Sequence, residues 1–374
     1  MSSFTPPKFA NNQENPSPQG VNLTPQNFPK LLKHLVDLGA SDLHLTAGRP
    51  PVIRLHSELT PVPGLNVLTD QTLRAVLYNI MRPWQRAAFE DQLELDFAHA
   101  EDNIGRFRVN VFQQRASIGA VMRTIPSVVP NFDTLGLPES VKEFTNLHRG
   151  LILVTGATGS GKSTTLAAMI DMINEKKPLH IMTIEDPIEF LHNHKKAVVN
   201  QRELGLDTKS FKAALKHVLR QDPDVILVGE LRDLETIQLC LTAAETGHLV
   251  FGTLHTQDAP QSVDRIIDVF PPDQQDQIRV MLSNTLQGIV CQQLVRKTDG
   301  KGRVVAAEVM VATSAIRNLI RENKTYQMFS AIASGARYGM VSMDQSLARL
   351  VREHQISMDD AKARAHSPED LKLH

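Results

Sequence analysis

The sequence predicts an α/β protein with two domains, a smaller α+β domain followed by a larger domain built on a parallel sheet. Three observations predict this. The chain has 374 residues, of which 41% are apolar, enough to fill two hydrophobic cores. From Gly150 onwards, wholly apolar segments alternate with helical patterns, which is typical of a parallel sheet covered by helices on both faces. Before that point the segments alternate apolar with polar residues and favour an antiparallel sheet.

The individual elements follow in chain order. The first residues are rich in Pro, Asn, Gln and Ser, so we expect them to be disordered. FPKLLKHLVDLGA then spaces its apolar residues three and four apart and predicts an amphipathic helix that stops at Gly39. From Asp273 the chain is expected to be mostly helical and to end in a helical bundle. The expected segments are a tail (1–26), the α+β domain (27–130), a linker with one short helix (131–148), the parallel-sheet domain (149–365) and a polar tail (366–374).

Composition excludes several classes of protein. Lys plus Arg number 40 against 41 Asp plus Glu, so no net positive field draws the chain to nucleic acid. The two cysteines, Cys240 and Cys291, lie far apart, which argues against a disulfide framework or a zinc site. The N-terminus lacks a cationic start followed by an apolar block, and no run of about 18 apolar residues occurs. We therefore expect a cytoplasmic protein without a membrane span.

The segment GATGSGKS connects the apolar strand LILVTG to the helical pattern TTLAAMIDMI. This spacing, in a strand–loop–helix setting, is the pattern of a phosphate-binding loop. Its glycines let backbone N–H groups turn inward, and the helix N-terminus adds a positive dipole end. Lys162 is expected to reach the β and γ phosphates of ATP, and Ser163 to ligate Mg²⁺. The predicted nucleotide-binding residues of this loop are Gly156, Thr158, Gly159, Ser160, Gly161, Lys162, Ser163 and Thr164.

Carboxylates follow two further apolar strands. HIMTIEDPIEF carries Glu185, Asp186 and Glu189, and DPDVILVGELRD carries Glu230. Ligands of open α/β sheets bind at the carboxyl ends of the strands, so Glu230 is expected near Mg²⁺ and the attacking water. Asp186 and the proline after it can equally form a plain turn.

Other polar residues near these strands have two readings each. The strand HLVFGTLHT begins with His248 and carries His255 near its end. His255 is expected at the nucleotide end, where it could sense the γ-phosphate, whereas His248 is either a nucleotide contact or a structural hydrogen-bonding residue. Arg232, Asp233 and Glu235 are either functional or simply the solvated start of a helix.

The four blocks GATGSGKST, TIEDPIEF, DPDVILVGELRDLET and AAETGHLVFGTLHT match, in order and spacing, the Walker A, Asp-box, Walker B and His-box motifs of the secretion-type ATPases of type II secretion and type IV pili. The chain resembles that family over residues 27–360. It is similar to the pilus retraction branch, since ASDLHLTAGRPP and AIRNLIRE (residues 315–322) resemble that branch's signatures and no tetracysteine zinc insert occurs. It departs from the branch at His56 and Ser57, and in reading NQRELGLDT for NQREVHRDT.

The resemblance implies a PAS-like N-terminal domain, a RecA-like ATPase domain and a homohexamer in which a neighbouring subunit completes each ATP site. Glu230 and Glu189 would share metal positioning and water activation. Charge-stabilising arginine fingers would come from the N-terminal domain, the candidates being Arg106, Arg108 and Arg123. The implied motor withdraws pilin subunits for twitching motility. Its partners would be an inner-membrane platform protein, where the motor is peripheral, and optionally a second retraction ATPase.

Two rival functions and one rival role stay open. A DNA-translocating ring would need a basic, aromatic-lined channel, which the near-zero net charge and 5% aromatic content oppose. An accessory subunit that binds nucleotide with little turnover is opposed by the intact Lys162, Glu189, Glu230 and His255. The AIRNLIRE helix is amphipathic, with one apolar side and its arginines available, and is expected to serve retraction instead of hydrolysis, ordinary helix packing being the alternative. The apolar side consists of Ile316, Leu319 and Ile320.

Overall fold

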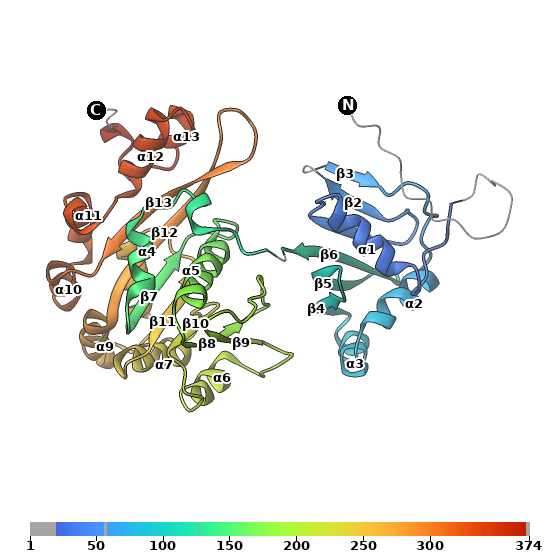
Figure 1. Cartoon of the computed structure of the whole chain (residues 1–374), viewed down its shortest axis with the longest axis horizontal. Coiled ribbons are helices and arrows are strands. Elements are labelled where there is room, and N and C mark those ends of the chain that lie inside the picture. Colours follow the sequence, from blue (N-terminus) through green and yellow to red (C-terminus); the bar gives the residue numbers. More distant parts are fainter. Residues whose placement is uncertain (1–19, 56–57, 127, 372–374) are drawn as a thin grey trace. The chain divides into compact units, whose positions relative to one another are not determined.

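A computed structural model describes residues 20–55, 58–126 and 128–371. The chain divides into two compact units, Met1–Ser127 and Val128–His374, drawn in Figure 1. Within the described ranges, no helix has the length and apolarity needed to cross a membrane. His56, Ser57 and most of the predicted N-terminal tail lie outside these ranges.

The N-terminal unit is a six-stranded antiparallel sheet in the order β3-β2-β1-β6-β5-β4. Apolar side chains alternate along β5, where Phe107, Val109 and Val111 are fully buried against the helices. The opposite face of the same strand carries polar side chains. The elements are α1 (Phe28–Asp37), β1 (Asp42–Leu45), β2 (Val52–Leu55), β3 (Glu58–Pro61), α2 (Asp70–Ile80), α3 (Pro83–Gln92), β4 (Glu94–Glu101), β5 (Gly105–Gln114) and β6 (Ser117–Ile125).

Residues 20–26, which the sequence assigned to a disordered tail, pack on the N-terminal unit. The Val21 N–H donates to Gly64 O at 2.8 Å, and Leu23 is buried in the core of this unit. Two apolar side chains and a paired backbone are enough to hold this short stretch. The N-terminal unit therefore includes residues 20–26, ahead of the boundary at residue 27 that the sequence predicted.

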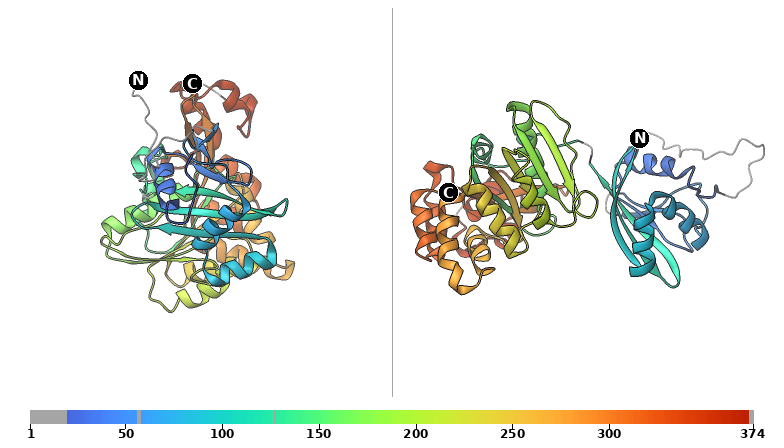
Figure 2. Two further views of the ribbon diagram at one scale, coloured as in Figure 1. Left: turned by 90° about the vertical axis from the view of Figure 1, so that its right-hand side faces the viewer. Right: turned by 90° about the horizontal axis from the view of Figure 1, so that it is seen from below.

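The C-terminal unit contains a seven-stranded sheet in the order β13-β12-β7-β11-β10-β8-β9, parallel except for β13. Leu151 and Leu153 of β7 enter one core, and Ile152 and Val154 enter the core of the opposite face. Helix α5 covers one face, and α6 to α9 cover the other (Figures 1 and 2). The predicted mixed α/β fold with both faces covered is confirmed. The elements are α4 (Ser140–Glu143), β7 (Gly150–Thr155), α5 (Lys162–Lys176), β8 (His180–Glu185), β9 (Val198–Glu203), α6 (Phe211–Val218), β10 (Val225–Val228), α7 (Leu234–Glu245), β11 (Leu249–Leu254), α8 (Ala259–Asp268), α9 (Pro272–Thr285), β12 (Leu286–Arg296), β13 (Arg303–Val311), α10 (Ser314–Arg321), α11 (Met328–Ala333), α12 (Met343–Arg352) and α13 (Met358–Lys362).

The expectation of a mostly helical chain after Asp273 is wrong for β12 and β13, which form an antiparallel pair within the large sheet. In β12 the glutamines interrupt the apolar run, and Gln292 is buried with its amide on Thr165 Oγ1 at 2.9 Å. A strand that buries polar side chains among long-range partners lacks the plain apolar pattern of a core strand.

The helices after β13 do not share one core, in contrast to the expected bundle. Helices α10 and α11 pack into the main core, whereas α12 and α13 pack with Val295 and Ala306 of the β12–β13 pair. The described part of the predicted C-terminal tail is also held in place. Asp344 accepts the N–H groups of His366 and Ser367 at 2.7 and 3.0 Å.

Strand β9 forms one edge of the large sheet. The N–H groups of Val199 and Glu203 point away from the neighbouring strand, because Val198 and Leu204 donate to residues 179 and 185. His194 Nδ1 accepts the Val199 N–H at 3.1 Å, and Asp207 Oδ2 accepts the Glu203 N–H at 2.9 Å. Side chains thus occupy two outward N–H groups of this edge.

Candidate nucleotide-binding site

The GATGSGKS loop joins the carboxyl end of β7 to the N-terminus of α5, as Figure 1 shows. Gly156 has φ 138°, and a Cβ there would lie 2.4 Å from Gln292 O and 2.6 Å from Ser160 Oγ. Only glycine fits this position. Gly161, with φ 94°, is the N-cap of α5 and offers no side chain to the free N–H groups of the first turn. The N–H groups of this first turn are therefore available to donate hydrogen bonds to a ligand held in the loop.

Lys162 folds back over the loop. Its Nζ donates to Gly156 O at 2.7 Å and to Ala157 O at 3.0 Å. Burial lowers the pKa of Lys162, and the nearby Glu230 and Glu189 carboxylates raise it in opposition. The ammonium group therefore lies between the loop and the two acidic residues that the sequence predicted to join it. Ser163 and Thr164 follow in the first turn of the helix.

Glu230 follows β10, and two side chains contact its carboxylate, a guanidinium group and an imidazole ring. Arg232 forms a fork, with Nε 2.6 Å from Glu230 Oε1 and Nη2 2.7 Å from Oε2. His255, directly after β11, places Nε2 3.3 Å from the same Oε1. Arg232, followed by His255, lowers the pKa of the Glu230 carboxyl below its ordinary value, against the opposing effect of burial. The carboxylate is accordingly ionised at neutral pH and able to orient a cation or a water molecule.

Arg232, which the sequence analysis left as either functional or the solvated start of a helix, contacts Glu230 in the structure. The helix it precedes, α7, is instead capped by Asp233, whose Oδ1 accepts Thr236 N at 2.8 Å. The signal available was the spacing in GELRD, because an arginine two residues beyond a glutamate at a strand end can turn back onto it. That spacing alone does not separate a solvated arginine from a paired one.

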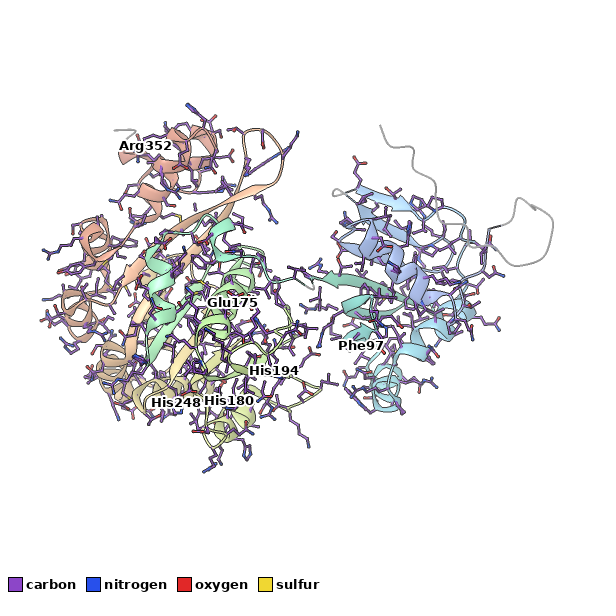
Figure 3. The ribbon with its side chains drawn as sticks, viewed as in Figure 1. Phe97, Glu175, His180, His194, His248 and Arg352 are labelled. Carbon is purple, nitrogen blue, oxygen red and sulfur yellow. The ribbon has the colours of Figure 1, made fainter. Side chains whose placement is uncertain are left out.

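His248 is not brought to this site. Leu249 begins β11 and pairs with Gly150, the first residue of β7, so His248 lies at the opposite end of the sheet from the phosphate loop (Figure 3). Its Nδ1 lies 2.9 Å from Ala243 O and 3.3 Å from Thr246 Oγ1. Within one subunit, His248 therefore fits the second of its two predicted roles, that of a structural hydrogen-bonding residue.

Glu189 is exposed in the turn after β8, and its neighbours are tightly bonded. Glu185 accepts hydrogen bonds from Thr183 Oγ1 at 2.6 Å, from Gln201 Nε2 at 3.1 Å and from the Glu189 N–H. Burial raises the pKa of the Glu185 carboxyl, and these hydrogen bonds oppose that effect. The Glu185 carboxyl thus holds the backbone of the turn that Asp186 begins.

The three candidate arginine fingers lie in the N-terminal unit, on the polar face of its sheet. Arg108 of β5 stands opposite Arg123 of β6 and both are exposed, while Arg106 lies two residues before Arg108. Arg123 Nε donates to Asp42 Oδ1 at 2.9 Å. Burial raises the pKa of Asp42, but hydrogen bonds from its hydroxyl neighbour and from Arg123 outweigh this and lower it. This face therefore presents several cationic groups, of which Arg123 is held by Asp42.

The helix α10 carries the AIRNLIRE segment. Ile316 and Ile320 are fully buried in the main core. Arg317, which the sequence analysis treated as available, donates to the backbone carbonyls of Ser283 and Asn284 near the end of α9 and to a glutamine side chain. The buried side of α10 thus packs in the core, and its arginine bonds backbone carbonyls near the end of α9. The exposed side of α10 carries Asn318 and Glu322.

Comparison with known proteins places these features in context. The type II/IV secretion system protein family matches residues 26–364. The type IV pilus retraction ATPase PilT of Pseudomonas aeruginosa is 52% identical over 345 residues, 92% of this chain and 100% of that protein. The type IV pilus ATPase PilU of the same organism is 44% identical, over 92% of this chain and 90% of that protein. A crystal structure of the pilus retraction motor PilT with bound ADP superposes with a TM-score of 0.86 at 48% identity, covering 91% of this chain and 98% of that chain.

Proposed function

Since this chain belongs to the type II/IV secretion system protein family, we propose that it is an ATP-hydrolysing motor that drives the retraction of type IV pili. The observation that carries the proposal is the ionised Glu230, forked by Arg232 and contacted by His255. This cluster follows the strands next to and beyond the phosphate-loop strand, in a chain 52% identical to PilT over that protein's whole length.

The loop residues fit a nucleoside triphosphate. The absence of room for a Cβ at Gly156 supports a close backbone approach to phosphate. The Ser160 hydroxyl is buried and has no hydrogen-bond partner among the described residues. Lys162 would exchange its loop carbonyls for the β and γ phosphates, since a phosphate offers a full negative charge where the carbonyls offer dipoles. Thr158, Gly159, Gly161 and Thr164 complete the proposed phosphate contacts.

Hydrolysis then rests on the carboxylates. Ser163 and Glu230 would hold Mg²⁺, which, when bound, neutralises phosphate charge. Because its pKa is lowered, Glu230 remains ionised and its carboxylate can orient an attacking water. Glu189 would share this water positioning, and His255 would report on the terminal phosphate through its contact with Glu230. His248 has no proposed nucleotide contact within one subunit.

The proposed assembly is a homohexamer with an α/β, RecA-like ATPase domain and a PAS-like N-terminal domain in each subunit. Arg106, Arg108 and Arg123 would act as fingers on a neighbour's nucleotide, supported by their position on one polar sheet face. The motor would lie in the cytoplasm, at the inner membrane through the pilus platform protein, optionally together with a second retraction ATPase. Nucleic acid is not a proposed partner.

Mg²⁺-dependent ATP hydrolysis by the purified protein, beside Glu230→Gln and the matched control Glu235→Gln, tests the proposal. Loss of the carboxylate that orients the attacking water should cost about 100-fold or more in rate, so Glu230→Gln should be nearly inactive while light scattering still shows a hexamer. Glu235 lies exposed at the start of α7 with Lys212 as its partner, so its variant should hydrolyse ATP normally. A wild-type hexamer that binds ATP without hydrolysing it would instead support the accessory-subunit alternative.

A further inference from the structure

The turn over residues 186–190, which carries Glu189, is held through its backbone by two carboxyl groups. Glu185 at the end of β8 accepts the Glu189 N–H, and Glu203 at the end of β9 accepts the Ile188 N–H at 3.1 Å. Glu203 is only 3% exposed. The two strands pair in parallel register, with Glu185 opposite Glu203, so both carboxyl groups reach the same turn.

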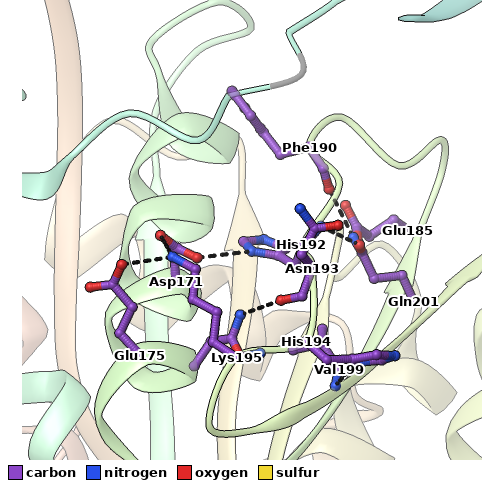
Figure 4. Close-up of polar contacts among 11 residues, drawn as sticks. Asp171, Glu175, Glu185, Phe190, His192, Asn193, His194, Lys195, Val199 and Gln201 are labelled. Atoms are coloured by element: carbon purple, nitrogen blue, oxygen red, sulfur yellow. Dashed lines mark hydrogen bonds and ion pairs between the residues drawn. The ribbon is translucent and has the colours of Figure 1, made fainter. Parts of the chain in front are cut away.

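Gln201 of β9 forms hydrogen bonds to three residues at or beside this turn. Its Nε2 donates to Glu185 Oε1 at 3.1 Å and to Phe190 O at 2.8 Å, and its Oε1 accepts the His192 N–H at 2.8 Å (Figure 4). Gln201 lies opposite Thr183 in the β8–β9 register, and Thr183 bonds the same Glu185 oxygen. The Gln201 amide therefore connects Glu185, before the turn, to Phe190 at the end of the turn and to His192 beyond it.

The chain beyond the turn is anchored separately, on the helix that follows the phosphate loop. Asn174 of α5 accepts the Lys195 N–H through Oδ1 at 3.0 Å and donates through Nδ2 to Asn193 O at 2.8 Å. Lys195 Nζ lies 2.8 Å from Asp171 and 2.7 Å from Glu175, both on α5; Figure 4 includes these ion pairs. Asn174 thus holds the same loop as Gln201 but further from Glu189.

We propose that Gln201 is a positioning residue for Glu189, acting through the Glu185 carboxyl and the Phe190 carbonyl. The inference rests on the proposed function, in which Glu189 positions the attacking water. Glu189 is exposed, so no packing holds its side chain, and the point from which its carboxylate reaches the site is set by the backbone that the Gln201 amide fixes. Displacements of about 1 Å in such groups can cost about 100-fold in rate.

The test is the steady-state ATPase of Gln201→Leu, which removes the amide and leaves an apolar side chain. We expect kcat to fall at least about tenfold with KM within about threefold, because the phosphate loop is untouched. The control Asn200→Ala, on the other face of β9 with His180 as its partner, should match the wild type. Asn174→Ala should lower the melting temperature but leave kcat within about threefold.

Two further readouts separate positioning from general loosening. In a Glu189→Gln background, Gln201→Leu should cause little additional loss, because its effect acts through the missing carboxylate. Amide hydrogen exchange of a peptide covering 186–192 should be faster in Gln201→Leu than in wild type or Asn200→Ala. A kcat within about twofold of wild type, equal losses in both backgrounds, or an equal loss in Asn174→Ala would each overturn the proposal.

Two possible results require an additional variant or measurement. If Gln201→Leu does not fold, Gln201→Glu serves, because it keeps the acceptor for the His192 N–H and removes the donors to Glu185 and Phe190. If the wild-type protein hydrolyses no ATP, the proposed function fails. The exchange measurement then still decides whether Gln201 fixes the turn, and unchanged exchange would overturn that part.

Discussion

A buried acid in the second unit allows a quantitative prediction about stability. Glu308 of β13 is 3% exposed, and its Oε1 accepts the Ala259 N–H at the start of α8 at 2.9 Å. Burial, with a smaller contribution from the nearby Asp258 carboxylate, raises the pKa of Glu308 from its ordinary value of 4.5 to about 7. The folded protein therefore keeps this proton at a pH at which the unfolded chain has released it.

The difference between about 7 and 4.5 is about 2.5 pKa units, which at 1.36 kcal/mol per unit amounts to about 3 kcal/mol. The pKa is raised in the folded state, so the folded protein binds more protons between these values. Stability is fully present below pH 4.5 and is lost as the pH rises through about 7. No further loss from this group is expected above that pH.

Glu308→Gln removes the titration and keeps an acceptor for the Ala259 N–H. Chemical denaturation should show the variant gaining about 2–3 kcal/mol more over wild type at pH 8 than at pH 5. Glu353→Gln, an exposed carboxylate on the surface after α12, is the matched control and should show no such difference. The same stability change of Glu308→Gln at both pH values would refute the reasoning.

Three further outcomes are expected. Gly156→Ala places a methyl group 2.4 Å from Gln292 O and should weaken ADP binding by more than about tenfold in a fluorescent-nucleotide titration; unchanged affinity would contradict the close packing. Arg232→Ala removes the main cause of the lowered pKa of Glu230, so the acid limb of the pH–rate profile should move to higher pH, and an unmoved limb would count against this pairing. Arg317→Lys cannot reproduce the contacts of two guanidinium nitrogens, Nη1 on the Asn284 carbonyl of α9 and Nη2 on Gln287 of β12, and should lower unfolding free energy by about 1–3 kcal/mol in denaturant titration, whereas unaltered stability would show that these contacts are dispensable.

The parts of the site that the sequence predicts are those with local signals. The phosphate loop is defined by residues within eight positions of one another, and Glu230 and His255 are found because each directly follows an apolar strand. His248 could have been set aside by the same logic, since it precedes its strand. Lys162 lies near both predicted carboxylates in the structure, which the order of strands in the sheet brings about.

What the sequence does not predict depends on long-range partners. The role of Gln201 requires the register of β8 against β9 and partners 9 to 16 residues away. Strand β12 was missed because its buried Gln292 bonds through its amide to Thr165, 127 residues earlier. In both cases a polar side chain that would signal surface in a sequence is wholly or partly buried with a partner from another element.

The side chains on the outer edge of β9 have a consequence for association. An exposed edge strand is a template on which another chain can add a strand and begin to aggregate. His194 and Asp207 already occupy the N–H groups that an incoming strand would need at Val199 and Glu203. A neighbour meeting this edge therefore finds two of its outward N–H groups already bonded, which opposes the addition of a strand at those positions.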